Sequence, residues 1–151
     1  MRPTEKLKAL NLRLPEVSAP AGKYSHARRS GMLLYLSGKG HGEYRGKVGR
    51  DLNLQEAQDY ARTTTLMLLA VIVQELGSLD RVRQILKVTG YVNAIPEFSD
   101  HPRVMNGCSE LLLEIFGEQG SHARTSIGVA STPDQIPVEI DLVIEFSDKS
   151  A

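Results

Sequence analysis

The most regular pattern of apolar and polar positions lies near the C-terminal end of the chain, in residues 137–146. Every second residue there is apolar, and most of the residues between are acidic. The apolar positions are Val138, Ile140, Leu142 and Ile144, and the acidic ones are Glu139, Asp141 and Glu145. Because successive side chains of a strand point to opposite faces, the pattern predicts a strand with one buried face. The polar face is expected to meet either solvent or another subunit.

Residues 54–76 instead repeat apolar positions at steps of three and four, which is typical of a helix with one buried side. Asn53 stands where such a helix is capped, and Glu56 completes a capping box three residues later. Gly77 is a favourable residue for ending the helix. The sequence therefore predicts a helix over residues 54–76 with both of its ends marked.

A second helix is predicted over residues 102–116, with Asp100 as its cap and Gly117 at its end, and a short one over residues 3–10. Four more segments are predicted to be strands: residues 32–37, 44–48, 83–93 and 124–130. Leaving the short helix aside, the order is strand, strand, helix, strand, helix, strand, strand. This order favours an α+β fold with two helices packed on one face of a mixed sheet.

Composition narrows the classes of protein that fit. The 151 residues suit a single domain, and Lys+Arg and Asp+Glu both number 18, which gives a formal net charge of zero. Nucleic acid is therefore not an expected partner, because a broad phosphate-binding face needs clustered cations. The one cysteine, Cys108, excludes an intrachain disulfide and favours a reducing compartment. No apolar stretch suits a signal peptide or approaches the roughly 18 residues of a membrane span, so we expect a cytoplasmic protein without membrane contact.

The strongest local combination of reactive side chains is His122 and Arg124 at the start of one predicted strand, with Glu139 at the start of the next. Opposite charges at strand starts are easily brought together across a sheet. Arginine offers a planar fork for a carboxylate, and glutamate can orient or deprotonate a water molecule. An ion pair without a catalytic role explains the same pattern, and from periodicity alone it ranks first.

The other candidates have simpler explanations. The GKGHG segment at 38–42 does not match a P-loop and predicts a turn, with backbone N–H groups that line a pocket as its functional alternative. Cys108 falls on the apolar side of the second helix and is expected to be buried and inert. No metal or cofactor is expected, because the histidines do not form ligand pairs. They are His26, His41, His101 and His122.

Several segments occur in the same order as in the RidA/YjgF family, the reactive intermediate deaminases long described as L-PSP endoribonucleases. They are Tyr24 after AGK, LLYLSGKG, the helix ending in ELG, KVTGYVNA, MNGCSELLLEIFG, HARTSIGVA and PVEID. Together they span roughly residues 18–146, and ARTSIGVA and PVEID are the most specific. The chain resembles a longer subgroup of this superfamily, in which residues 1–17 form an N-terminal extension of the single domain 1–151 and carry the short helix.

The resemblance implies a chorismate-mutase-like fold and a homotrimer with ligand clefts between subunits. It implies that Arg124 holds the carboxylate of the substrate and that Glu139 positions the attacking water. Tyr24 and Asn106 would line the cleft. The substrate would be an enamine or imine derived from an amino acid, and the products would be a 2-keto acid and ammonia.

Two residues depart from the family pattern. Ser126 stands where the deaminases usually carry a cysteine, and Lys39 stands where glutamine is common. Because the resemblance gives that cysteine a role largely through its backbone, Ser126 is compatible with activity, whereas Lys39 adds a cation near the cleft. The leading hypothesis is an imine deaminase. The alternatives are a non-catalytic trimer that binds a small carboxylate metabolite, an endoribonuclease, and a chorismate-mutase-like activity by analogy of fold alone.

Overall fold

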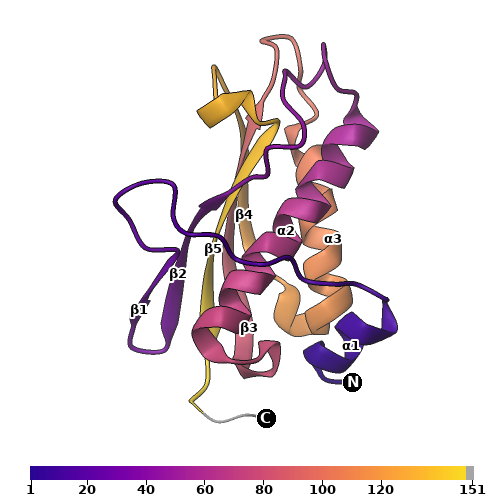
Figure 1. Ribbon diagram of the computed structural model, residues 1–151. Coiled ribbons are helices and arrows are strands. Elements are labelled where there is room, and N and C mark those ends of the chain that lie inside the picture. The colour runs from indigo at the N-terminus through magenta and orange to yellow at the C-terminus, as the bar shows by residue number, and fades with distance from the viewer. Residues whose placement is uncertain (149–151) are drawn as a thin grey trace.

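A computed structural model of the protein describes residues 1–148. The helices are α1 (Pro3–Ala9), α2 (Leu54–Leu76) and α3 (His101–Phe116), and the strands are β1 (Ala27–Ser30), β2 (Leu33–Lys39), β3 (Val82–Asn93), β4 (Ala123–Val129) and β5 (Val138–Phe146). The strands form one sheet in the order β1-β2-β5-β3-β4, in which only β3 and β4 run parallel. Helices α2 and α3 pack against each other on one face of this sheet (Figure 1). The predicted mixed α+β arrangement is confirmed.

The long helix α2 has the predicted bounds and caps. The side chain of Asn53 accepts a hydrogen bond from the backbone of Glu56 at 2.9 Å, and the carboxylate of Glu56 accepts one from the backbone of Asn53 at 3.1 Å. Gly77 ends the helix with φ 87°, a left-handed conformation that glycine adopts at little cost. The local sequence signals at both ends of α2 therefore fix its length.

The predicted strand at residues 44–48 is wrong. In this segment only Val48 makes isolated bridges, and the additional strand is β1, which pairs with β2 as an antiparallel hairpin. Gly31 begins the two-residue connection with φ 57°, which is the conformation that tight hairpin turns demand. Strand β1 contains a single buried residue, Ala27, so it has no alternating pattern that would have predicted it.

The start of α3 differs in one detail from the prediction. Asp100 occupies the N-cap position, but its side chain makes no capping hydrogen bond. Its carboxylate instead lies 3.9 Å from the guanidinium of Arg103, one turn into the helix. Gly117 ends the helix, as predicted, with φ 61°.

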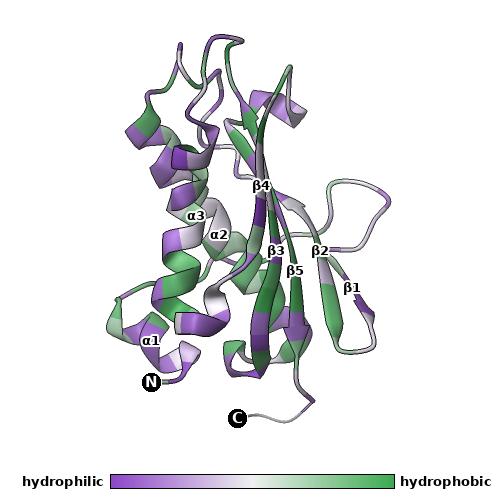
Figure 2. Cartoon of the chain, turned by 180° about the vertical axis from the view of Figure 1, so that it is seen from behind, coloured by the Kyte–Doolittle hydropathy of each residue, from purple (hydrophilic) through white to green (hydrophobic). Residues whose placement is uncertain are grey.

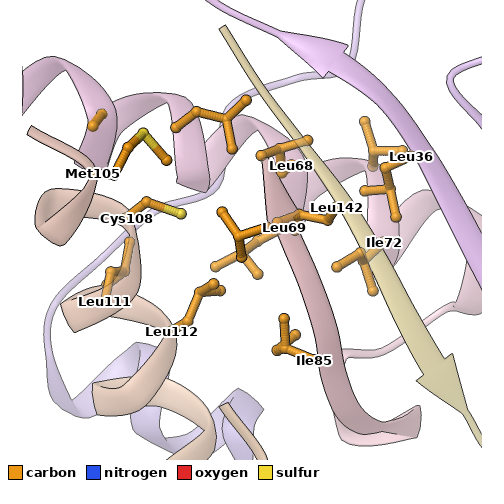
Figure 3. Close-up of a cluster of buried hydrophobic side chains, with 14 of the residues drawn as sticks. Leu36, Leu68, Leu69, Ile72, Ile85, Met105, Cys108, Leu111, Leu112 and Leu142 are labelled. Carbon is orange, nitrogen blue, oxygen red and sulfur yellow. The ribbon is translucent and has the colours of Figure 1, made fainter. Parts of the chain in front are cut away.

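The core lies between the two long helices and the sheet. Strand β5 alternates between buried and partly buried residues along its whole length, as its sequence pattern predicts. Figure 3 shows how the buried side chains interdigitate. They include Leu68, Leu69 and Ile72 of α2, Met105, Cys108 and Leu112 of α3, and Ile85 and Leu142 of the sheet, all at most 1% exposed. Burial of this kind contributes about 1.5–3 kcal/mol for each large side chain.

The opposite face of the sheet is not covered by either long helix (Figure 2). Two large apolar residues of this face stand open to solvent in the single chain: Tyr35 of β2 is 48% exposed, and Ile127 of the edge strand β4 is 46% exposed. This face therefore combines polar residues of β5 with exposed apolar groups. No helix within residues 1–148 has the length and apolar character needed to cross a lipid bilayer.

Candidate functional site

Arg124 lies on the face of the sheet that the helices cover. In the parallel pairing of β3 with β4 it stands opposite Val88, which itself stands opposite Leu142, and both of these residues are buried in the core. Residues opposite each other in a sheet share a face, so the arginine is directed toward α3. Its Nη1 donates to Oδ1 of Asn106 at 2.8 Å and to Oγ of Ser109 at 3.0 Å. Arg124 and Asn106, which the family resemblance assigns to the same cleft, are thus in direct contact.

Both of these hydrogen bonds use one corner of the guanidinium of Arg124. Within residues 1–148, its Nε and Nη2 have no hydrogen-bond or ion-pair partner. These two nitrogens form one edge of the planar group, and an edge of this kind holds a carboxylate or phosphate through two parallel hydrogen bonds. The contacts with α3 therefore fix the arginine and leave an edge free for an anion.

A chain of hydrogen bonds from Gly120 through His122 and Ser109 holds Arg124 in position. Nδ1 of His122 lies 2.6 Å from the carbonyl oxygen of Gly120, which can only accept, so Nδ1 carries a proton. In the neutral imidazole Nε2 is then an acceptor, and it lies 2.8 Å from the hydroxyl of Ser109. Ser109 donates to His122 and accepts from Arg124. Sequence reasoning missed Ser109, although its place one turn after Asn106 puts it on the same side of α3.

Ser126 lies two residues beyond Arg124 and therefore on the same face of β4. Its Oγ is buried and has no hydrogen-bond partner within residues 1–148. An unsatisfied buried hydroxyl costs about 1–3 kcal/mol. We name Arg124, Asn106, Ser109, His122 and Ser126 the arginine group.

Glu139 lies on the opposite face of the sheet. It stands opposite Tyr91 in the antiparallel pairing of β3 with β5, and Asp141 stands opposite Thr89. The side chains of Tyr91 and Thr89 both hydrogen-bond Asp141, which confirms that they share one face. Burial raises the pKa of Glu139, the negative charge of Asp141 raises it further, and Lys39 opposes both effects. Glu139 is therefore a stronger proton acceptor than an ordinary glutamate.

A cavity of about 400 Å³ borders this glutamate. Its lining brings together Tyr24, His26, Lys39 and Glu139, which we name the glutamate group. Lys39 Nζ lies 2.5 Å from Nδ1 of His26 and 5.8 Å from the centre of the Tyr24 ring. Burial lowers the pKa of Lys39, against the opposing effect of Glu139. Three predicted site residues, Tyr24, Lys39 and Glu139, therefore meet here, and His26 joins them without having been predicted.

The expected pairing of Arg124 with Glu139 does not form within one chain. Strand β3 separates β4 from β5 in the sheet, and the two side chains point to opposite faces. Sequence reasoning treated two strands that follow each other in the chain as neighbours, but β5 pairs with β2 and β3 instead. The six predicted site residues fall into two groups, with Arg124, Asn106 and Ser126 in one and Tyr24, Lys39 and Glu139 in the other.

The GKGHG segment forms no phosphate cradle. Strand β2 continues through Lys39, two residues further than predicted, and the glycines of the segment line the cavity. A Cβ at Gly38 would lie 2.9 Å from Oε2 of Glu139, so the glycine allows the carboxylate to approach the strand. His41 stacks on Tyr60 of α2 with ring centres 4.1 Å apart, and this contact fixes the far end of the segment.

Cys108 is fully buried between α2 and α3, and burial raises the pKa of its thiol to about 11. We expect the native protein to react with a thiol reagent far more slowly than the unfolded protein, because the reactive thiolate is scarce and inaccessible. Cys108→Ala should leave any activity unchanged while lowering the thermal midpoint slightly through the small cavity that it creates. Loss of activity in a folded Cys108→Ala variant would contradict the assignment of Cys108 as a core residue.

The chain matches the family model described as "YjgF/chorismate mutase-like, putative endoribonuclease" over residues 4–145. It belongs to the YjgF/RidA family and has its chorismate-mutase-like fold. Protein TCP17 of Trypanosoma cruzi is 37% identical over 147 residues, which cover 93% of this chain and 92% of that protein.

Two solved structures are similar to the protein along almost its whole length. Atu1372 of Agrobacterium tumefaciens, described as a protein of unknown function, is 35% identical with a TM-score of 0.89, and the match covers 96% of this chain and 92% of that one. A "putative endoribonuclease" of Shewanella oneidensis MR-1 is 33% identical with a TM-score of 0.93, and the match covers 97% and 100%. Nearly the whole chain thus has counterparts in these two structures.

Proposed function

We propose that the protein is a deaminase that hydrolyses 2-imino acids to 2-keto acids and ammonia in clefts between the subunits of a homotrimer. The proposal rests on the division of the candidate site residues between the arginine group and the glutamate group. The arginine group offers a free guanidinium edge for a carboxylate, and the glutamate group offers a carboxylate with a raised pKa beside a cavity. Because Arg124 and Glu139 lie on opposite faces of one sheet, both can act on one small molecule only when different chains contribute them.

The open face of the sheet supports assembly. Exposed Tyr35 of β2 and Ile127 of β4 lie on either side of the polar residues that β5 and β3 place on this face. We propose that another chain covers this face and buries both apolar side chains, because no helix within residues 1–148 does so. A second chain seated there would bring its own arginine group close to the glutamate group.

In the proposed reaction, the free edge of Arg124 binds the carboxylate of the substrate. Glu139 accepts a proton from a water molecule as the water adds to the electrophilic imine carbon. The resulting carbinolamine then expels ammonia and leaves the 2-keto acid. Free imines already hydrolyse in water, so positioning and charge stabilisation need to supply only a modest acceleration.

Two other activities share parts of this site. A trimer that only binds a small carboxylate would use the arginine group and would not need the raised pKa of Glu139. An endoribonuclease is the activity that the family description and the Shewanella protein carry in their names. A net charge of zero disfavours it, because RNA binding relies on clustered cations.

The test measures ammonia release from freshly generated 2-iminopropionate, with and without the purified protein, together with sedimentation equilibrium. We expect faster release with the protein and a particle of three chains. Release at the uncatalysed rate, combined with tight binding of pyruvate, would favour the binding protein. A stable monomer at micromolar concentration would remove the shared cleft and the proposal with it.

A further inference from the structure

Lys39 occupies an unusual position for a lysine. Only 9% of the residue is exposed, and it lines the same cavity as Glu139. A lysine with the ordinary pKa of about 10.4 is almost entirely protonated at neutral pH and cannot act as a nucleophile. Burial lowers the pKa of Lys39, which increases the share of neutral amine.

His26 provides a base for this amine, and its tautomer is fixed by the backbone. Nε2 of His26 lies 2.5 Å from the carbonyl oxygen of Ser18, which can only accept a hydrogen bond. Nε2 therefore carries the proton, and Nδ1 of the neutral ring presents its lone pair to Lys39 Nζ at 2.5 Å. A nucleophile, a base within hydrogen-bond reach and a third group that orients the base are the parts of an activated nucleophile.

The surroundings suit a small carbonyl or imine compound. The cavity of about 400 Å³ lies in the range of small-molecule sites. Tyr24 and Lys39 form one part of its wall, and Glu139 contributes a carboxylate that can receive a proton. The cation–π contact with Tyr24, at 5.8 Å, favours the charged amine, but it is weak because Tyr24 is 47% exposed.

We propose that Lys39 is a catalytic nucleophile that forms a Schiff base with the substrate carbon, so that the protein deaminates by transimination. This inference rests on the proposed function and adds a covalent step to it. The neutral amine of Lys39 attacks C2 of the protonated imine, and a C–N bond forms while the π electrons move to the imine nitrogen. His26 takes a proton from the Lys39 nitrogen and returns it to the departing nitrogen.

Ammonia then leaves, and C2 remains joined to Lys39 as a protonated ketimine. Water adds to C2 and gives a proton to Glu139. The carbinolamine collapses to the 2-keto acid and the free amine of Lys39, and Glu139 releases its proton to solvent water. The balance is one imine and one water consumed for one keto acid and one ammonia released, with no oxidant or reductant. A 2-keto acid that enters the cavity would form the same ketimine directly by loss of water.

This last route provides the test. The full-length protein is incubated with pyruvate and sodium cyanoborohydride, which reduces a ketimine to a stable secondary amine, and the modified lysines are located by peptide mass spectrometry. We expect modification of Lys39 to exceed that of Lys23, an exposed lysine of the same chain, by at least about 10-fold. His26→Gln should reduce this excess. Lys39→Gln, which introduces the residue that the family commonly carries, should slow imine turnover by at least about 10-fold in a protein that still folds.

The outcomes separate the covalent step from the proposed function. Labelling of Lys39 no greater than that of Lys23, with imine turnover intact, would overturn the nucleophile and leave direct hydrolysis. Selective labelling with full turnover in Lys39→Gln would place the adduct off the reaction path and would also overturn transimination. Selective labelling without any imine turnover by the wild-type protein would support the Schiff base and overturn the deaminase. If Lys39 is not selectively labelled and the wild-type protein does not turn over the imine, both the Schiff base and the deaminase are overturned.

Discussion

Arg124→Ala should weaken the binding of a 2-keto acid, or the turnover of the imine, by about 10- to 100-fold. The free edge of its guanidinium can make two charge-assisted hydrogen bonds to a carboxylate, and a bond to a charged group is worth about 1.5–3 kcal/mol. Arg124→Lys should restore only part of the loss, because an ammonium group cannot reproduce the planar fork. Titration calorimetry with pyruvate measures the affinity, and a thermal melt reports on folding.

The matched control for this substitution is Arg13→Ala. Arg13 is an exposed arginine between α1 and β1, so its loss removes the same formal charge without touching the arginine group. Arg13→Ala should bind pyruvate as the wild type does. Unchanged affinity in a folded, trimeric Arg124→Ala protein would place the carboxylate site elsewhere.

The sequence predicts those parts of the fold whose signals are local. The capping box at Asn53 and the left-handed Gly77 mark α2 to the residue, and strict alternation marks β5. Strand β1 was not predicted, because it contributes only one buried residue to the core. Its position is set by hairpin pairing with β2. The loop at residues 44–48 was wrongly predicted to be a strand, because its composition is compatible with one. Whether such a short segment forms a strand depends on tertiary packing.

The sequence names candidate site residues but does not reveal how they are arranged. Arg124 and Glu139 begin consecutive strands, and nothing local reveals that β3 lies between them or that they face opposite sides. The hydrogen bond between His26 and Lys39 joins residues that are 13 apart in the chain, one just before β1 and the other at the end of β2. Such contacts depend on register, which is set by the whole sheet rather than by a motif.

Glu139→Gln should lower kcat for imine hydrolysis by about 100-fold or more while leaving the affinity for a 2-keto acid within a few-fold of the wild type. General-base catalysis typically contributes a factor of about 10²–10⁴, and an amide cannot accept the proton of the water molecule. Turnover of the wild type should rise with pH as Glu139 loses its proton, and the midpoint should lie above that of an ordinary glutamate because its pKa is raised. The matched control is Glu145→Gln, on the same strand and the same face, which should retain full activity.

The same substitution should stabilise the fold at neutral pH. The pKa of Glu139 is higher in the folded protein than in the unfolded chain, so the folded state binds the proton more tightly. This contribution to stability is therefore greatest at acid pH, falls as the pH rises from the unfolded pKa of about 4.3 to the raised folded pKa, and stays low above it. Glutamine has no charge to bury, so Glu139→Gln should raise the thermal midpoint at pH 7 and have a smaller effect at pH 4. A variant that loses activity but gains stability separates a catalytic carboxylate from a structural one, because removal of a stabilising ion pair would lower the midpoint.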